Sequence, residues 1–184
     1  MRRYIGHWLA QCVQMGSKII SIDPRLTWWG ARAEYFLQIR PGTDGALACA
    51  WLNIIINEGL YDRDFVDCWC TGFEELAASV QEFTPAWAAE ITGLPEADIA
   101  ASARLYATAK PAAIQWGLAM DQQLSAMSLN LACCDLMALT GNVDVPGAIS
   151  SYATLQRHEP PSNRAGHTER MAREEAHHEV RFRR

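Results

Sequence analysis

The sequence has few of the features that identify common classes of binding protein. Lysine is nearly missing, with Lys18 and Lys110 set against fourteen arginines, and the formal net charge of the 184 residues is −5. The basic residues are scattered along an acidic chain, whereas a nucleic-acid-binding protein concentrates positive charge on one face. The composition therefore predicts no nucleic-acid partner.

Long hydrophobic runs are also missing. The longest apolar stretch, residues 46–56, is interrupted by Asn53 and is too short to cross a bilayer. Arg2 and Arg3 resemble the start of an export signal, but His7 and Gln11 interrupt the apolar region that should follow. The sequence predicts no membrane span and shows no targeting signal, so it leaves a cytoplasmic or a periplasmic location open.

The cysteines form no C-x-x-C pair and no other spacing typical of zinc or iron–sulfur ligation. We expect them to be buried thiols, with Cys68 and Cys70 in one helix and Cys133 and Cys134 inside an apolar one. Cys12 precedes the first predicted strand, where a metal ligand could lie, but packing is the default role of such a thiol. The sequence identifies no metal ligand and no catalytic residue.

Strand-like and helix-like segments alternate along most of the chain. Short apolar strands are predicted at residues 18–22, 35–39 and 112–116. Helices are predicted at residues 4–15, 44–57, 63–69 and 124–139, and others start at Thr84-Pro85 and at Leu94-Pro95. This order favours an α/β fold with three layers, in which helices flank a largely parallel, Rossmann-like sheet.

The composition changes near the end of the chain. We assign residues 1–150 to a partial α/β domain and residues 151–184 to a polar tail, which holds four of the five histidines. Such a tail buries too little apolar surface to offset its chain entropy, so it is expected to be disordered or a solvated helix. Its adjacent His177 and His178, with His167, supply no complete metal-ligand set.

Two carboxylates stand where α/β sheets bind nucleotides. Asp23 ends the first strand because Pro24 cannot continue a central ladder, and ligands bind at that edge of a sheet. Pro41 and Gly42 then break the chain before a helix that starts near Asp44, whose free N–H groups suit an anion. The carboxylates are expected to share one crevice; alternatively, Asp23-Pro24 is a turn and Asp44 a helix N-cap.

A series of short motifs extends this pattern in a fixed order. They are Lys18-Ile19-Ile20-Ser21-Ile22-Asp23-Pro24-Arg25, Ile39-Arg40-Pro41-Gly42-Thr43-Asp44, Glu58-Gly59-Leu60-Tyr61-Asp62, Gly72-Phe73-Glu74, Phe83-Thr84-Pro85, Ile91-Thr92-Gly93, Ala103-Arg104-Leu105-Tyr106-Ala107, Trp116-Gly117 and Leu139-Thr140-Gly141-Asn142. In order and spacing, residues 5–149 resemble the molybdopterin oxidoreductases that carry bis(molybdopterin guanine dinucleotide), the dimethyl sulfoxide reductase and formate dehydrogenase group. Trp28-Trp29 after Thr27 is similar to the branch with acetylene hydratase and the hydroxytransferases.

The resemblance implies a set of cofactor contacts. The Asp-Pro-Arg and P-G-T-D segments of the family lie against the guanine dinucleotide, and the loop after Trp-Gly passes near the pterin. A carboxylate suits guanine because it accepts from two adjacent donors, and an arginine can meet either a phosphate or a surface carboxylate. The residues that carry over are Asp23, Pro24, Arg25, Thr27, Gly42, Asp44, Gly117 and Gln122.

Departures from the family leave other interpretations open at this loop. Ala119 stands where relatives often have glycine, so an ordinary strand-to-helix loop is the alternative to a tight cofactor approach. Thr140-Gly141-Asn142 is interpreted as a helix C-cap.

The resemblance also implies a larger enzyme. Family members hold molybdenum or tungsten, a 4Fe-4S cluster in an N-terminal domain, a metal ligand upstream of the Asp-Pro-Arg segment and a C-terminal barrel. None of these parts is present here, so we expect an internal piece of an enzyme for two-electron redox or oxygen or hydroxyl transfer. The implied partners are its remaining domains and an iron–sulfur electron-transfer subunit.

Two other classes of function compete with the molybdopterin oxidoreductase interpretation. An NAD enzyme would need a G-x-G-x-x-G turn before the acidic residue, and the sequence has none there. The main alternative is a non-catalytic nucleotide-binding or interaction module, or a non-functional truncated product.

Overall fold

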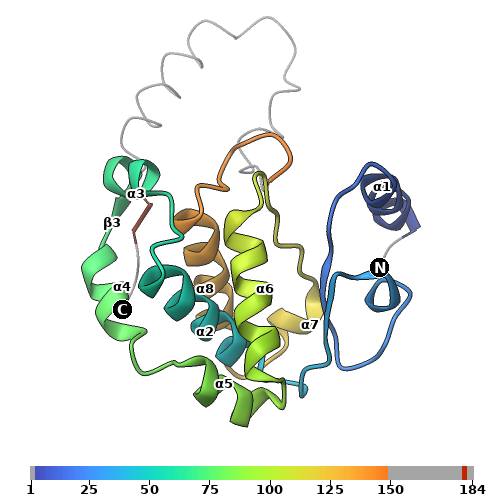
Figure 1. Cartoon of the computed structure of the whole chain (residues 1–184), viewed down its shortest axis with the longest axis horizontal. Helices are drawn as coiled ribbons and strands as arrows, with labels where there is room; N and C mark the ends of the chain where they lie inside the picture. Colours follow the sequence, from blue (N-terminus) through green and yellow to red (C-terminus); the bar gives the residue numbers. More distant parts are fainter. Residues whose placement is uncertain (1–2, 149–179, 182–184) are drawn as a thin grey trace, which may run out of the picture.

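A group of packed helices forms the centre of the computed structural model, which describes residues 3–148 and 180–181 (Figure 1). Helix α2 (Asp44–Asn57) contacts α5 (Pro85–Thr92), α6 (Glu96–Thr108) and α8 (Ala126–Leu139). Its sequence is apolar almost all round, and such a helix is stable only when other elements cover it on several sides. The core of the fold is therefore built around α2.

Side chains of α2 account for much of this core. Leu52 and Ile55 are 2% and 0% exposed. The Trp51 ring stacks on Tyr106 of α6 with 5.6 Å between centroids. Buried Asn53 donates from Nδ2 to the Val80 carbonyl oxygen at 2.9 Å, which satisfies a polar group that would otherwise destabilise the interior. This bond ties α2 to the end of α4 (Phe73–Ser79).

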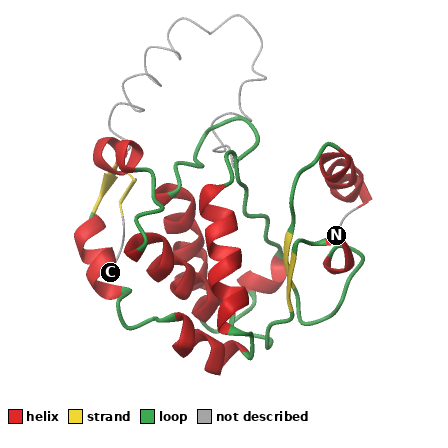
Figure 2. Ribbon diagram, in the orientation of Figure 1, coloured by secondary structure: helices red, strands yellow, loops and turns green. Residues whose placement is uncertain are grey.

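The strands form small parallel pairs at the two sides of the helices (Figure 2). β1 (Ile20–Ile22) pairs with β2 (Tyr35–Leu37), and the 3-10 helix η1 (Gly30–Arg32) lies in the connection between them. β3 (Cys70–Thr71) pairs with β4 (Val180–Arg181). The fold therefore mixes helices with parallel strands, as predicted, in the form of small sheets.

Most predicted helix ends are confirmed. α1 (Arg3–Gln14) leads into a turn in which Gly16 has a φ of +98°, and α2 is followed by Gly59 with a φ of +66°. Thr84 caps α5 by accepting from the Trp87 N–H at 3.2 Å, and Pro85 is the first helical residue. Asp62 likewise caps α3 (Arg63–Trp69). These ends follow from local backbone chemistry, so a single sequence is enough to predict them.

The strand predicted at residues 112–116 is wrong. This segment belongs to neither sheet, and the Ala112 N–H donates to the side chain of Asn142 rather than to a neighbouring strand. The short helix α7 (Leu118–Asp121) follows it and was not predicted. An apolar run of this length forms a strand only where a neighbouring strand pairs with its backbone N–H and C=O groups.

The cysteine predictions are confirmed in part. Cys133 is buried within α8, while Cys12, Cys49 and Cys70 are half-buried. Cys68 and Cys134 are exposed, and Cys70 lies on β3 rather than in a helix, so those expectations are wrong.

The predicted polar tail, with His167, His177 and His178, lies outside the described residues except for β4. In the part that the structure describes, no helix is long and apolar enough to span a membrane.

Leu52→Ala tests the role of α2 in the core. We expect the free energy of unfolding to fall by about 2–5 kcal/mol, because the substitution leaves a cavity among packed helices. Urea unfolding followed by circular dichroism measures the change. Leu124→Ala is the matched control, since Leu124 is fully exposed and its truncation should change stability little. Equal effects of the two substitutions would contradict this description of the core.

Candidate cofactor site

The carboxyl ends of β1 and β2 carry the first set of predicted site residues. Asp23 follows β1, and its N–H donates to the Leu37 carbonyl oxygen at 3.2 Å. Asp23 Oδ1 accepts from the Arg25 N–H at 2.8 Å, a side-chain bond that closes a turn around Pro24. The Pro24 carbonyl oxygen in turn accepts from Gln38 Nε2 at 3.2 Å.

The turn interpretation of Asp23-Pro24 is thus confirmed, but the turn uses only one oxygen of the Asp23 carboxylate. No hydrogen bond to the second oxygen is found within residues 3–148. Arg25 is exposed beside it, and Thr27 Oγ1 accepts from the Gly30 N–H at 3.2 Å. The turn therefore leaves one oxygen of the half-buried Asp23 side chain and the exposed Arg25 side chain for another molecule.

The start of α2 carries the second set. Gly42 has a φ of +82°, which favours glycine, and Thr43 is the N-cap residue, with Oγ1 donating to the Arg40 carbonyl oxygen at 2.7 Å. Asp44 is the first helical residue, so its interpretation as the N-cap is wrong. Its carboxylate lies in the first turn, where the helix dipole favours negative charge.

The loop between α7 and α8 meets this helix start. Gln123 Nε2 donates to Asp44 Oδ2 at 2.9 Å, although the two residues are 79 positions apart. Gln123 Oε1 is buried and has no hydrogen-bond partner. The predicted Gln122 is exposed at the end of α7, so the structure places its neighbour at the carboxylate. The adjacent glutamines were the only sequence signal for Gln123.

The remaining predicted residue, Gly117, has extended backbone just before α7, and a Cβ there would meet no atom within 4 Å. The structure therefore brings Asp44 together with the loop after Gly117, and Asp23 together with the end of β2. Within the described residues, the Asp23 and Asp44 side chains share no hydrogen-bond partner, and their common crevice stays a prediction.

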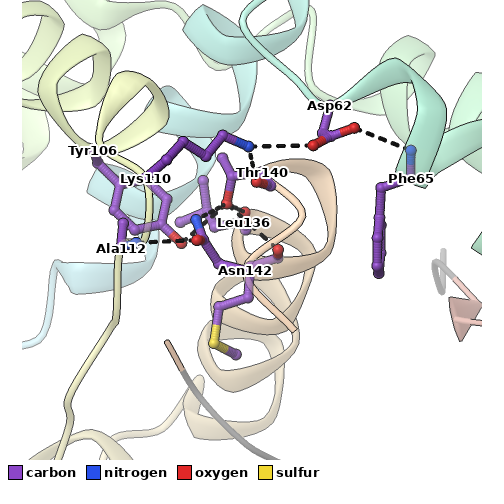
Figure 3. Close-up of polar contacts among 9 residues, drawn as sticks. Asp62, Phe65, Tyr106, Lys110, Ala112, Leu136, Thr140 and Asn142 are labelled. Atoms are coloured by element: carbon purple, nitrogen blue, oxygen red, sulfur yellow. Dashed lines mark hydrogen bonds and ion pairs between the residues drawn. The ribbon is translucent and has the colours of Figure 1, made fainter. Parts of the chain in front are cut away.

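A polar network fixes the start of the segment that leads into this loop (Figure 3). Lys110 Nζ donates to the Thr140 carbonyl oxygen at 2.5 Å and to Asp62 Oδ2 at 3.3 Å. Buried Asn142 accepts from the Ala112 N–H at 3.0 Å and donates to Thr140 Oγ1 at 2.8 Å. The residues after α6 are thus held to the end of α8.

The predicted C-cap at Thr140-Gly141-Asn142 is confirmed, since Thr140 caps α8 and Gly141 has a φ of +65°. The same network reaches α3 through Asp62, whose pKa is lowered chiefly by the hydrogen bond from the Phe65 N–H and further by Lys110.

A half-buried carboxyl, that of Asp135, lies among thiols on α8. Burial raises the pKa of Asp135 to about 7. Burial also raises the pKa values of Cys49 and Cys70, with a smaller contribution from Asp135, and raises that of Cys133 to about 12. These thiols stay protonated near neutral pH. Among the described residues, no group of three or more His, Cys, Asp or Glu side chains can hold a metal ion.

Comparison with known proteins identifies the family to which this chain belongs. The sequence model of the family described as "Molybdopterin oxidoreductase" matches residues 4–180. The chain therefore belongs to the molybdopterin oxidoreductase family.

Individual relatives lie in the branches that the motifs indicate. Over 142 residues the chain is 41% identical to acetylene hydratase of Syntrophotalea acetylenica, and over 133 residues 38% identical to formate dehydrogenase H of Escherichia coli. These alignments cover 74% and 72% of this chain but only 20% and 19% of the relatives.

The similarity extends to the fold. The solved structure of acetylene hydratase from Pelobacter acetylenicus superposes with a TM-score of 0.71 at 43% identity, covering 72% of this chain and 18% of that one. The chain thus spans about a fifth of the length of the relatives it matches.

Asn142→Leu tests the network that holds the loop. The substitution leaves the Ala112 N–H without its acceptor, and we expect the free energy of unfolding to fall by about 1–3 kcal/mol. Chemical denaturation measures it, with Asn57→Leu at an exposed position as the matched control. Unchanged stability of Asn142→Leu would show that the network does not anchor the segment.

Asp135→Asn tests the half-buried carboxyl through the pH dependence of stability. Because the pKa of Asp135 is raised from 3.8 to about 7 on folding, its contribution to stability is complete below pH 3.8 and is lost as pH rises through about 7. Asparagine does not titrate, so the difference in unfolding free energy between the two proteins should change across this window. Denaturation midpoints at several pH values measure it. An unchanged pH profile in Asp135→Asn would contradict a raised pKa of this carboxyl.

Proposed function

We propose that this chain holds the guanosine part of a bis(molybdopterin guanine dinucleotide) cofactor in a molybdenum or tungsten enzyme. The observation that carries the proposal is the hydrogen bond of 2.9 Å between Asp44 and Gln123. It joins the P-G-T-D segment to the loop after Trp116-Gly117, two segments that the family resemblance assigns to the cofactor. A binding site requires that residues far apart in the sequence lie close together in the fold, and these two segments do so.

The chemistry of the side chains fits a guanine nucleotide. Guanine presents a ring N–H and an amino group side by side as donors, and a carboxylate accepts both. Among the described residues, no hydrogen-bond donor meets the second oxygen of Asp23, Oδ1 of Asp44 or Oε1 of Gln123. Exposed Arg25 can meet a phosphate bidentately. Acceptors for the base and a cation for the phosphate therefore lie on one chain.

When bound, the cofactor supplies two-electron redox or oxygen or hydroxyl transfer at its metal. The part of this chain is to bind and orient the nucleotide end, and we assign it no catalytic residue and no metal ligand. Relatives named as a hydratase and as a dehydrogenase both match, so the substrate is not fixed by family membership.

The proposed partners are the remaining domains of the parent enzyme and an iron–sulfur electron-transfer subunit. Leu118 of α7, Leu124 of the following loop and Met127 of α8 are 68%, 112% and 75% exposed. Exposed apolar side chains in such number indicate a surface that further protein covers. We also propose that the β1–β2 pair belongs to a larger parallel sheet, completing a three-layer, Rossmann-like domain in the parent enzyme.

The same exposed side chains favour a second candidate, an interaction module or a truncated product without turnover. A chain that binds guanine nucleotides and unfolds cooperatively acts as a binding module. A chain that aggregates and lacks a cooperative transition is a truncated product.

Asp23→Asn tests the proposal more sharply than removal of the side chain. Asparagine Oδ1 can still accept from the Arg25 N–H and keep the turn, but its amide group replaces the free acceptor with a donor. We expect the dissociation constant for guanosine diphosphate to rise at least about tenfold, because one charged hydrogen bond is lost. Titration calorimetry on the full chain measures it.

The melting temperature should change little in Asp23→Asn, and Asp67→Asn should bind like the unsubstituted chain. Unaltered affinity of Asp23→Asn would remove Asp23 from the site. Absence of nucleotide binding by the unsubstituted chain would contradict the proposed function itself.

A further inference from the structure

Helix α8 is apolar almost all round, but only one side of it is covered. Leu129, Cys133 and Leu136 lie on the buried side, and α8 packs there against α2. The residues of the opposite side recur three, four and seven positions apart and are exposed or half-buried: Leu124 just before the helix, Met127, Ser128, Leu131, Cys134 and Asp135. We call this set the outer face of α8. A helix that is apolar all round requires further protein over such a face.

Helix α1 carries an apolar stripe but takes no part in the core. Leu9, Cys12 and Val13 share one side of this helix and are half-buried. Among the described elements none packs closely against α1, and none of its described side chains joins the hydrophobic core. Figure 1 shows α1 apart from the packed helices, and it approaches the Trp29 ring at Gly6, where an added Cβ would lie 4.0 Å away. A helix of this length is marginal in water by itself, so a further surface is needed to cover its stripe.

The charges around the two helices are opposite. Residues 1–22 contain three Lys or Arg residues and no Asp or Glu, whereas residues 111–156 contain three Asp residues and no Lys, Arg or His. Asp135 lies half-buried on the outer face of α8, and no hydrogen bond or ion pair of its carboxyl is found within residues 3–148. The outer face therefore suits an apolar segment with a basic surrounding, which is the character of α1.

We propose that the outer face of α8 binds helix α1 of a second copy of this chain, and that two copies exchange their α1 helices reciprocally. Reciprocal exchange closes about a two-fold axis, so it gives a dimer and not a filament. The contact is made twice in each dimer, which helps to reach the about 1,200 Å² of total buried surface that a specific interface needs. The inference goes beyond the proposed function and does not depend on nucleotide binding.

Sedimentation velocity of the full chain over a range of concentrations tests the proposal. We expect an equilibrium of monomer and dimer, and Met127→Asp should raise the dissociation constant of the dimer at least about tenfold, because a carboxylate would be buried in an apolar contact. Trp69→Asp is the matched control, since Trp69 is an apolar side chain that is 52% exposed on α3. A chain that stays monomeric at every concentration, or equal effects of the two substitutions, would overturn the proposal.

A substitution on α1 identifies the occupant of the outer face. Leu9→Asp should weaken the dimer as Met127→Asp does. In a mixture of the two variants, the intact α1 of Met127→Asp can bind the intact outer face of Leu9→Asp, so a mixed dimer should form more tightly than either variant forms with itself. If Leu9→Asp dimerised like the unsubstituted chain, two outer faces would pair with each other and the proposed exchange would be wrong.

Folding of the variants is checked separately. Met127 is exposed in the single chain, so the melting temperature of Met127→Asp should match that of the unsubstituted chain at concentrations where both are monomeric.

The dependence on salt tests the contribution of charge. Because the two regions carry opposite charges, the dissociation constant of the dimer should rise with ionic strength. A dissociation constant that falls as salt is added would contradict the choice of α1 as the occupant. A monomer that binds guanosine diphosphate would contradict this inference alone, and a dimer that does not bind it would contradict the proposed function alone.

Discussion

Burial of α2 is the constraint on which the rest of the structure depends. Because this helix is apolar almost all round, α5, α6 and α8 must pack against it, and both of its ends are then fixed in space. At its C-terminal end Glu58 forms a two-bond ion pair with Arg104 of α6, at 2.6 and 2.8 Å. At its N-terminal end Asp44 reaches the loop before α8. The helix that organises the core therefore also places the candidate site.

The site is organised by acceptors on separate segments rather than by a single loop. The turn at Asp23 uses one carboxylate oxygen, and the contact between Asp44 and Gln123 uses another. What each segment leaves unsatisfied is an oxygen, which suits a ligand rich in N–H donors. The network of Lys110, Thr140 and Asn142 adds no ligand contact of its own, but it fixes where the third segment begins.

Local chemistry explains which features the sequence predicts. Helix ends at Gly59, Thr84-Pro85 and Gly141 depend on residues within one turn, and all were predicted. The segment 112–116 was mistaken for a strand because apolar character alone says nothing about a partner strand. The family resemblance predicts Gln122, whereas Gln123 meets Asp44, because only the packing of α7 against α8 decides which of two neighbouring side chains faces that carboxylate. The family motifs predict the segments of the candidate site, and the fold shows that the segment with Asp44 contacts the loop after Gly117.

The central claim is that three segments far apart in the sequence bind one guanine nucleotide. Amide hydrogen exchange of the full chain, with and without guanosine diphosphate, tests this directly because it reports on every segment at once. The account predicts slower exchange on binding in residues 21–27, 42–46 and 117–124 together, with little change in α3 and α4. Protection confined to one segment, or uniform across the chain, would contradict a shared nucleotide site.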